Sequence, residues 1–149
     1  MQKKKLTGWL ILLILWIGLF SFGGGAGSLR TIKDDYQPYM ADYPSLPAAI
    51  TIFQLFLGAG MAVWIYTAWV LYRREPGTLA QAQICLVTGA ALRIASGYAI
   101  PLFAGFPGHT VQELMQDALL LTVFLFLFTT VWYLYLVRSQ KVREIYTGG

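Results

Sequence analysis

The 149-residue sequence has little of what soluble enzymes use. It contains one cysteine and one histidine, and only 12% of its residues are charged. A single cysteine excludes both an intramolecular disulfide and a four-thiolate metal site. Soluble domains carry about 25% charged residues, so the chain has roughly half the usual solvating surface. These shortages exclude an ordinary soluble domain.

Recognisable catalytic and metal-binding patterns are also missing. His109, the single histidine, has no histidine, cysteine or acidic cluster near it in the sequence. The run Gly23–Gly25 is not followed by Gly-Lys-Ser/Thr, so it does not match a phosphate-binding loop. No nucleophile and base stand in a recognisable order. We therefore expect no catalytic site, no metal and no cofactor, and we predict that the protein is not an enzyme.

What the chain has in abundance is apolar sequence, with 57% hydrophobic residues and a mean hydropathy of +0.58. Its four long apolar stretches do not alternate with period two, which argues against membrane β-strands. Each is long enough, at about 1.5 Å per residue, to cross a hydrocarbon core of about 30 Å. We predict an all-α fold, an integral membrane four-helix bundle in a single domain over 1–149. The expected helices cover 6–25, 48–72, 79–102 and 111–137.

The segment 28–46 is the only sizeable connection and is predicted to be an outer loop. It contains Pro38 and Pro44, and Pro47 follows it. Proline lacks the backbone N–H that a helix interior needs, so these residues oppose a continuous helix.

The first apolar stretch has a competing interpretation. Lys3, Lys4 and Lys5, an apolar run and then small residues have the layout of a cleaved secretory signal. The apolar run Leu6–Phe22 is 17 residues long. It exceeds the apolar region of about 7–15 residues that is typical of signal peptides, so we expect it to be retained as a membrane helix.

Basic residues are distributed unevenly between the two sides of the predicted bundle. One side holds only Arg30 and Lys33. The other side holds eight of the 11 basic residues, namely Lys3, Lys4, Lys5, Arg73, Arg74, Arg138, Lys141 and Arg143. Because short loops rich in Lys and Arg stay in the cytoplasm, both termini are predicted to be cytoplasmic. The net charge of +4 then reflects topology and attraction to anionic headgroups rather than nucleic-acid binding.

Arg93 is the basic residue within a predicted span. A charge at the membrane centre costs about 2.5–3.5 kcal/mol on insertion scales, so such residues usually face protein or water. Cys85, Gly89, Arg93 and Gly97 recur every four residues and share one helix face. Small residues on such a face let another helix approach closely, so we expect Gly89 and Gly97 to pack helices and Arg93 to point inward.

Close packing is also expected on the second helix, where Gly58 and Ala62 form a pair of small residues four apart.

Depth along the helices identifies candidate partners for Arg93. At 1.5 Å per residue, Arg93 lies about 13 Å and Asp117 about 9 Å below the outer ends of their helices. We predict an Arg93–Asp117 ion pair with Gln54, Ser96 and Glu113 close by. Two roles stay open. The pair either fixes helix packing or belongs to an outward-facing polar pocket that binds a ligand or relays ions.

The closing segment Trp132–Arg143 resembles that of the bacterial domain-of-unknown-function 2569 family. It has a tryptophan, a tyrosine three positions on, and then Ser-x-Lys-Val-Arg from Ser139. The start Gly8–Leu10 and the basic segment Tyr72–Pro76 are similar to the family's as well. Leu134 stands where the family often has proline, which indicates a divergent member. The resemblance implies a four-helix bacterial inner-membrane protein and supplies no activity.

Two function classes fit these observations. The first is non-catalytic binding of membrane lipids or of a partner membrane protein, with homodimerisation as a further option and no nucleic acid. The candidate contacts for headgroups or a partner are Arg73, Arg74, Arg138, Ser139, Lys141 and Arg143. The alternative is an oligomeric transporter or channel for small solutes or ions, acting through the pocket around Arg93 and Asp117.

Overall fold

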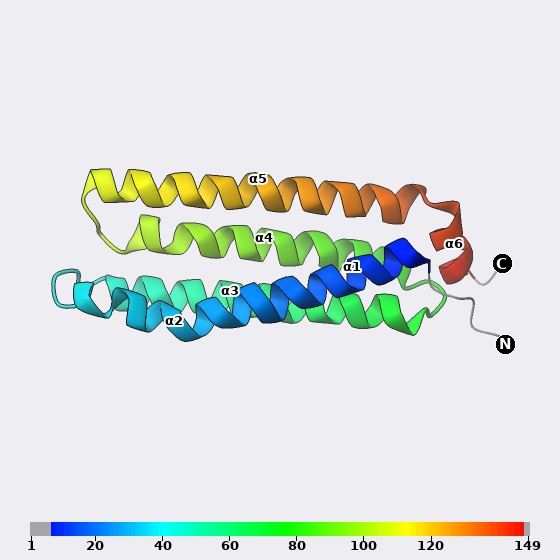
Figure 1. Ribbon diagram of the computed structural model, residues 1–149, viewed down its shortest axis with the longest axis horizontal. Coiled ribbons are helices and arrows are strands. Elements are labelled where there is room, and N and C mark those ends of the chain that lie inside the picture. Colours follow the sequence, from blue (N-terminus) through cyan, green and yellow to red (C-terminus); the bar gives the residue numbers. More distant parts are fainter. Residues whose placement is uncertain (1–6, 148–149) are drawn as a thin grey trace.

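The computed structural model describes residues 7–147, and within this range the chain is helical with no strand (Figure 1). Four helical segments are long and apolar enough to cross a membrane. They are Gly8–Tyr39, Leu46–Arg73, Leu79–Phe103 and Gly108–Arg138, with 32, 28, 25 and 31 residues. The predicted all-α membrane fold is therefore confirmed, and the chain is a multi-pass membrane protein.

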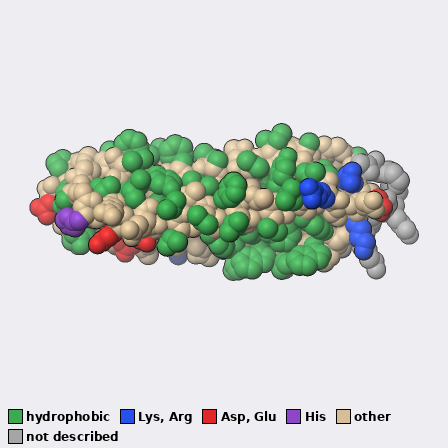
Figure 2. All heavy atoms as spheres, turned by 90° about the horizontal axis from the view of Figure 1, so that it is seen from above, with side chains coloured by type: hydrophobic (Ala, Val, Ile, Leu, Met, Phe, Trp, Pro, Cys, Tyr) green, Lys and Arg blue, Asp and Glu red, His purple; other side chains and the backbone are tan. Residues whose placement is uncertain are grey.

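Successive spans run in opposite directions, so the first described residues and the last helix lie at the same end of the bundle (Figure 1). We call this the basic end, because Arg73 and Arg138 lie there; Lys3, Lys4 and Lys5 are outside the described residues. Figure 2 shows acidic side chains and the histidine at the opposite end, the acidic end, with apolar side chains covering the length between. This distribution suits a molecule whose middle lies in hydrocarbon.

The first span corrects the predicted boundaries. It consists of α1 (Gly8–Leu19), the π-helix η1 (Phe20–Gly25), α2 (Ala26–Tyr36) and the 3-10 helix η2 (Gln37–Tyr39). The expected outer loop over 28–46 is therefore wrong for its first twelve residues, 28–39. No proline lies within α2, and Pro38 falls in η2, so these prolines act only after the helix has been completed.

The glycine run Gly23–Gly25 lies in the π-helix η1, where the first span widens. A π-helix bonds residues five apart, and the N–H of Ala26 donates to the carbonyl of Ser21 in this pattern. Gly25 is buried against α3 (Leu46–Arg73), and a Cβ there would lie 2.5 Å from Sδ of Met61. Glycine at this position therefore lets the widened helix lie against α3.

The pair α3 and α4 (Leu79–Phe103) packs by an exchange of large and small residues. A Cβ on Gly89 of α4 would overlap the ring of Trp64 on α3. A Cβ on Gly60 of α3 would lie 2.9 Å from Cγ of Arg93 and 3.1 Å from the carbonyl oxygen of Gly89. Each helix thus supplies one glycine and, four residues later, the large side chain that fills the gap opposite.

The predicted small-residue contacts are partly right. Gly89 faces α3 as described, whereas a Cβ on Gly97 would lie 3.3 Å from Leu121 of α5 (Gly108–Arg138). A four-residue step turns a helix by slightly more than one turn, so the stripe winds from α3 to α5. The expected packing at Gly58 and Ala62 is wrong, because a Cβ on Gly58 meets nothing within 4 Å and Ala62 is exposed.

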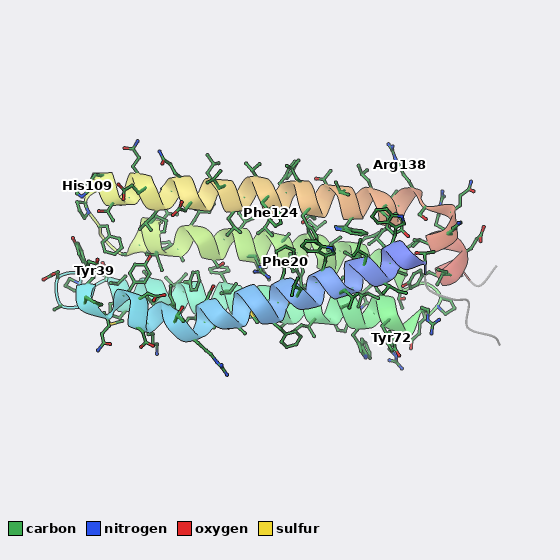
Figure 3. The ribbon with its side chains drawn as sticks, in the orientation of Figure 1. Phe20, Tyr39, Tyr72, His109, Phe124 and Arg138 are labelled. Carbon is green, nitrogen blue, oxygen red and sulfur yellow. The ribbon has the colours of Figure 1, made fainter. Side chains whose placement is uncertain are left out.

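The last span, α5, is the most exposed of the four. Aromatic rings fill the space between it and α1 and η1, where Phe20 contacts Phe124 and Phe128 at centroid distances of 5.5 and 5.7 Å (Figure 3). Nearer the basic end, Trp9 of α1 meets Trp132 at 6.2 Å. Long side chains rather than a close backbone approach therefore connect α5 to the first span.

A short helix that the sequence prediction missed, α6 (Gln140–Thr147), crosses the basic end of the bundle (Figure 1). Ser139 ends α5 in an extended conformation and accepts a hydrogen bond from the N–H of Val142, so it is the N-cap of α6. Val142 and Tyr146, four residues apart, are buried against the core. The signal that could have revealed α6 is this apolar pair following a serine cap.

Candidate functional site

Arg93 lies in the middle of the bundle, between α3 and the first span, and is 8% exposed. Its Nη1 donates a hydrogen bond of 3.1 Å to the carbonyl oxygen of Phe20, the first residue of η1. Its guanidinium carbon lies 4.9 Å from the ring centroid of Trp64. Trp64 is held in turn by a hydrogen bond from Nε1 to the Leu86 carbonyl, at 3.1 Å. The charge is thus compensated by a carbonyl and by the face of an aromatic ring.

The predicted Arg93–Asp117 ion pair is wrong. Arg93 forms no ion pair among the described residues, and Asp117 is exposed on α5. The neighbour of Asp117, Ala118, packs against Gly97, one turn of α4 closer to the acidic end than Arg93. In addition, α5 begins beyond the end of α4 (Figure 1). Equal depth counted from the helix ends therefore does not mean equal height in the bundle.

The other expected members of this polar cluster are not gathered around the guanidinium. Ser96 donates a 2.7 Å hydrogen bond to Arg93, but to its backbone carbonyl. Gln54 is half-buried on α3 without a hydrogen bond among the described residues, and Glu113 is exposed on α5. Phe20 and Trp64, the partners that Arg93 does have, could not be identified from charge or polarity.

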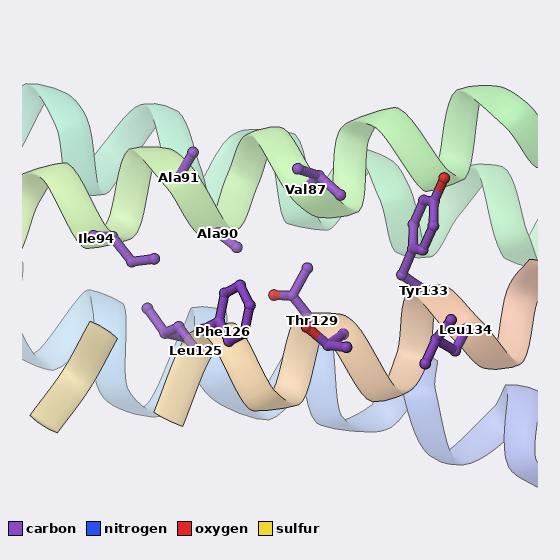
Figure 4. Close-up of a pocket in the computed structure, with 10 residues that line it drawn as sticks. Val87, Ala90, Ala91, Ile94, Leu125, Phe126, Thr129, Tyr133 and Leu134 are labelled. Atoms are coloured by element: carbon purple, nitrogen blue, oxygen red, sulfur yellow. The ribbon is translucent and has the colours of Figure 1, made fainter. Parts of the chain in front are cut away.

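A second feature is an apolar groove between α4 and α5, with a volume of about 300 Å³ (Figure 4). Most of its lining is aliphatic or aromatic, with Val87, Ala91 and Ile94 from α4 and Leu125, Phe126 and Leu134 from α5. It exists because alanines on α4 face threonines on α5, where small side chains leave space unfilled. The spacing of Ala90 and Ala91, or of Thr129 and Thr130, does not predict it without the register between the two helices.

Thr129 lines this groove and is one of two buried hydroxyl-bearing residues without a hydrogen-bond partner among the described side chains; Ser21 is the other. Other helical threonines of the protein, such as Thr67 and Thr122, donate to the carbonyl four residues earlier. A buried hydroxyl that has no partner calls for an explanation in a native structure. The hydroxyl oxygen itself is fully buried, so it does not open onto the groove.

The predicted headgroup or partner contacts do gather in space. Arg73 and Arg74 end α3, Arg138 ends α5, and Ser139, Lys141 and Arg143 belong to the start of α6, all at the basic end. Arg73 also stacks on Trp69, with its guanidinium carbon 4.6 Å from the ring centroid. Tryptophan and arginine in contact at the end of a span are typical of a membrane–water interface.

Tyr146 fastens α6 to this end. Its hydroxyl donates to the backbone carbonyl of Leu71 in the last turn of α3, where helical carbonyls lack a partner of their own. Its own carbonyl accepts a 3.0 Å hydrogen bond from the N–H of Gly77 in the α3–α4 connection. Burial raises the pKa of the Tyr146 hydroxyl, an effect that the nearby Arg74 opposes.

This pKa shift predicts a loss of stability at alkaline pH. Because the pKa of Tyr146 is raised on folding, its contribution is complete below the ordinary tyrosine value of about 10 and declines as the pH rises above it. Tyr146→Phe should remove this part of the pH dependence and cost about 1–3 kcal/mol, because the Leu71 carbonyl loses its donor. Thermal unfolding in detergent, compared between the two proteins from about pH 8 to about pH 11, measures both effects. Parallel pH profiles would contradict the assignment.

A third feature lies at the acidic end, where Tyr36, Tyr39 and Tyr43 surround Phe106 at centroid distances of 6.2, 6.5 and 4.6 Å. These rings border a cavity of about 250 Å³. Ser45 links the two connections of this end by donating to the carbonyl of Ala104 at 2.7 Å. Aromatic rings at the end of a bundle suit the headgroup region. His109 is exposed here, and no group of three metal-binding side chains occurs in residues 7–147.

Comparison with known proteins finds no matching family model, no similar curated protein and no similar solved structure. Membership of the 2569 family therefore stays a prediction, and function has to be argued from the site itself.

Proposed function

We propose that this protein is a non-catalytic multi-pass membrane protein that binds membrane lipid, with an acyl chain in the groove between α4 and α5. The observation that carries the proposal is the groove itself, an apolar space of about 300 Å³ between two membrane-spanning helices. Small-molecule sites have volumes of about 300–1,000 Å³, so the space suits part of a lipid.

The lining of the groove supports an acyl chain over a polar solute. Val87 and Phe126 are 45% and 65% exposed at its rim, so the groove opens sideways to the surrounding hydrocarbon rather than to water. The only polar side chains on its walls are Thr129, Thr130 and Tyr133. An apolar chain moves from the bilayer into such a site without burying a polar group, and it makes van der Waals contacts with the walls.

The same proposal includes orientation and membrane. The basic end, with Arg73, Arg138 and α6, faces the cytoplasm, because short loops rich in Lys and Arg are retained on that side. The membrane is the bacterial inner membrane, on the resemblance of the closing segment to the 2569 family. The exposed apolar face of α5 is the surface through which the protein would form a homodimer or bind a partner membrane protein.

Transport through Arg93 has less support. A pathway needs charged groups that face water, but the guanidinium of Arg93 is enclosed between a backbone carbonyl and Trp64. Asp117, the second group assigned to that pathway, is exposed on α5 and is not paired with Arg93. Arg93 is better explained as an internal connection between α4 and the first span.

Filling the groove tests the proposal. Ala91 lines the groove and is exposed. The larger side chain of Ala91→Phe should therefore fill the groove without overpacking the core. We expect lipid co-purified from mild detergent, measured by native mass spectrometry, to fall about tenfold, the effect of about 1.4 kcal/mol. Val87→Phe should act in the same way.

Ala59→Phe is the matched control, because Ala59 is an exposed alanine on α3 outside the groove. It should leave lipid retention unchanged. Equal retention in all three variants would exclude the groove as a lipid site.

A further inference from the structure

We propose that the groove is one end of a longer site that holds a single anionic phospholipid, with its phosphate bound at Arg143. This inference rests on the proposed function and adds the headgroup, its position and its charge. It follows from the way the groove continues along α4 to the basic end.

Two further cavities extend the groove in the same direction. The first, of about 420 Å³, shares Val87 and Tyr133 with the groove. The second, of about 520 Å³, shares Ala80 and Gln83 with the first and reaches Arg143. Because each cavity shares two wall residues with the next, the three form one continuous path on α4.

The length of this path matches one leaflet of a membrane. It runs from Ile94 to Leu79 on α4, 15 residues apart. At 1.5 Å per residue this is about 22 Å. A bilayer with its headgroup regions is about 40–45 Å thick, so one leaflet is about 20–22 Å. A phospholipid lying along α4 would therefore place its tail in the apolar groove and its phosphate at the basic end.

The chemistry of the walls changes along the path in the order that a phospholipid requires. The deep part is apolar. The middle part brings the polar side chains of Gln83, Thr88 and Tyr133 to the level of the glycerol esters. The last part ends at Arg143. Amide and hydroxyl donors suit ester carbonyls, and a guanidinium binds a phosphate through two parallel hydrogen bonds.

The docking of α6 determines which basic residue lines the last of these cavities. Val142 and Tyr146 point into the core, which turns Arg143 toward the cavity beside Gln83. Lys141 and Arg138 are exposed at the same end and do not line this cavity. The site therefore predicts that replacing Arg143 lowers the preference for anionic lipid, whereas replacing Arg138 or Lys141 does not. A purely electrostatic attraction would depend on all three residues alike.

The test is a competition between two lipids with the same acyl chains. The full-length protein is equilibrated with equal amounts of phosphatidylglycerol, which is anionic, and phosphatidylcholine, which is zwitterionic. Native mass spectrometry then measures the ratio of the two lipids retained. We expect a preference of about fivefold for the anionic lipid, since one basic residue near anionic headgroups contributes about 1 kcal/mol.

The variants separate the alternatives. Arg143→Gln should reduce the preference to near one, Arg143→Lys should retain it, and Lys141→Gln should leave it unchanged. If Arg143→Gln and Lys141→Gln lower the preference equally, the phosphate is not bound at Arg143 and the attraction is diffuse. If Ala91→Phe and Val87→Phe abolish binding of both lipids while Arg143→Gln keeps the preference, only the headgroup assignment fails. If neither groove variant reduces binding, the proposed function fails with it.

Discussion

Gly89→Ala should destabilise the protein more than alanine at any other glycine in residues 7–147. The added Cβ would overlap Cδ1 and Nε1 of Trp64, which is fully buried and fixed by its hydrogen bond to Leu86. Overpacking usually costs about 1–3 kcal/mol, and this contact falls at or above the upper limit because neither helix can withdraw without losing the other contacts of the pair. The loss is measured as a fall in the thermal unfolding temperature in detergent.

Gly58→Ala provides the control on the neighbouring helix. A Cβ at Gly58 meets nothing within 4 Å, so this change should stabilise the helix by about 0.5–1 kcal/mol, the ordinary advantage of alanine over glycine. In a Trp64→Leu background, Gly89→Ala should cost much less than in the native protein. If it costs the same in both, contact with Trp64 is not the reason for glycine at this position.

Arg93→Ala is the second change with a large expected effect. Removing the side chain deletes the hydrogen bond to the Phe20 carbonyl and the contact with Trp64, and it opens a cavity between α3 and the first span. The cavity alone should cost about 2–5 kcal/mol, as for other truncations of long buried side chains to alanine. Thermal unfolding and hydrogen exchange of the η1 amides should both report the change, since Arg93 is bonded to the first carbonyl of η1.

Two further variants show which part of Arg93 matters. Arg93→Met keeps most of the volume. It loses a charge-assisted hydrogen bond of about 1.5–3 kcal/mol and a cation–π contact of about 2 kcal/mol. It regains about 2.5–3.5 kcal/mol by removing a buried charge from the membrane, so the net loss should be about 0–2.5 kcal/mol.

Asp117→Asn should be neutral to within about 0.5 kcal/mol, because Asp117 is exposed and is not paired with Arg93. A loss of stability as large as that of Arg93→Ala would instead support an Arg93–Asp117 ion pair.

The contrast between Arg93 and Asp117 shows where sequence reasoning stops. That Arg93 faces the bundle follows from its cost in hydrocarbon and from the small residues on its helix face, and its burial confirms this. Its partners do not follow, because a backbone carbonyl and an aromatic face have no signature in a list of polar residues. The groove is also invisible in the sequence, since it depends on the register between α4 and α5.

By itself, the sequence determined the class of the protein. The lack of charge, the four apolar stretches and the distribution of basic residues lead to a four-span helical bundle, because hydrocarbon requires each span to satisfy its own backbone. Only the tertiary structure decided which residues meet. It continued the first span through a π-helix to Tyr39, placed Arg93 on the Phe20 carbonyl, docked α6 and left the groove open. The reason is that hydropathy sets how deep a segment lies, whereas helix register and side-chain volume set its neighbours.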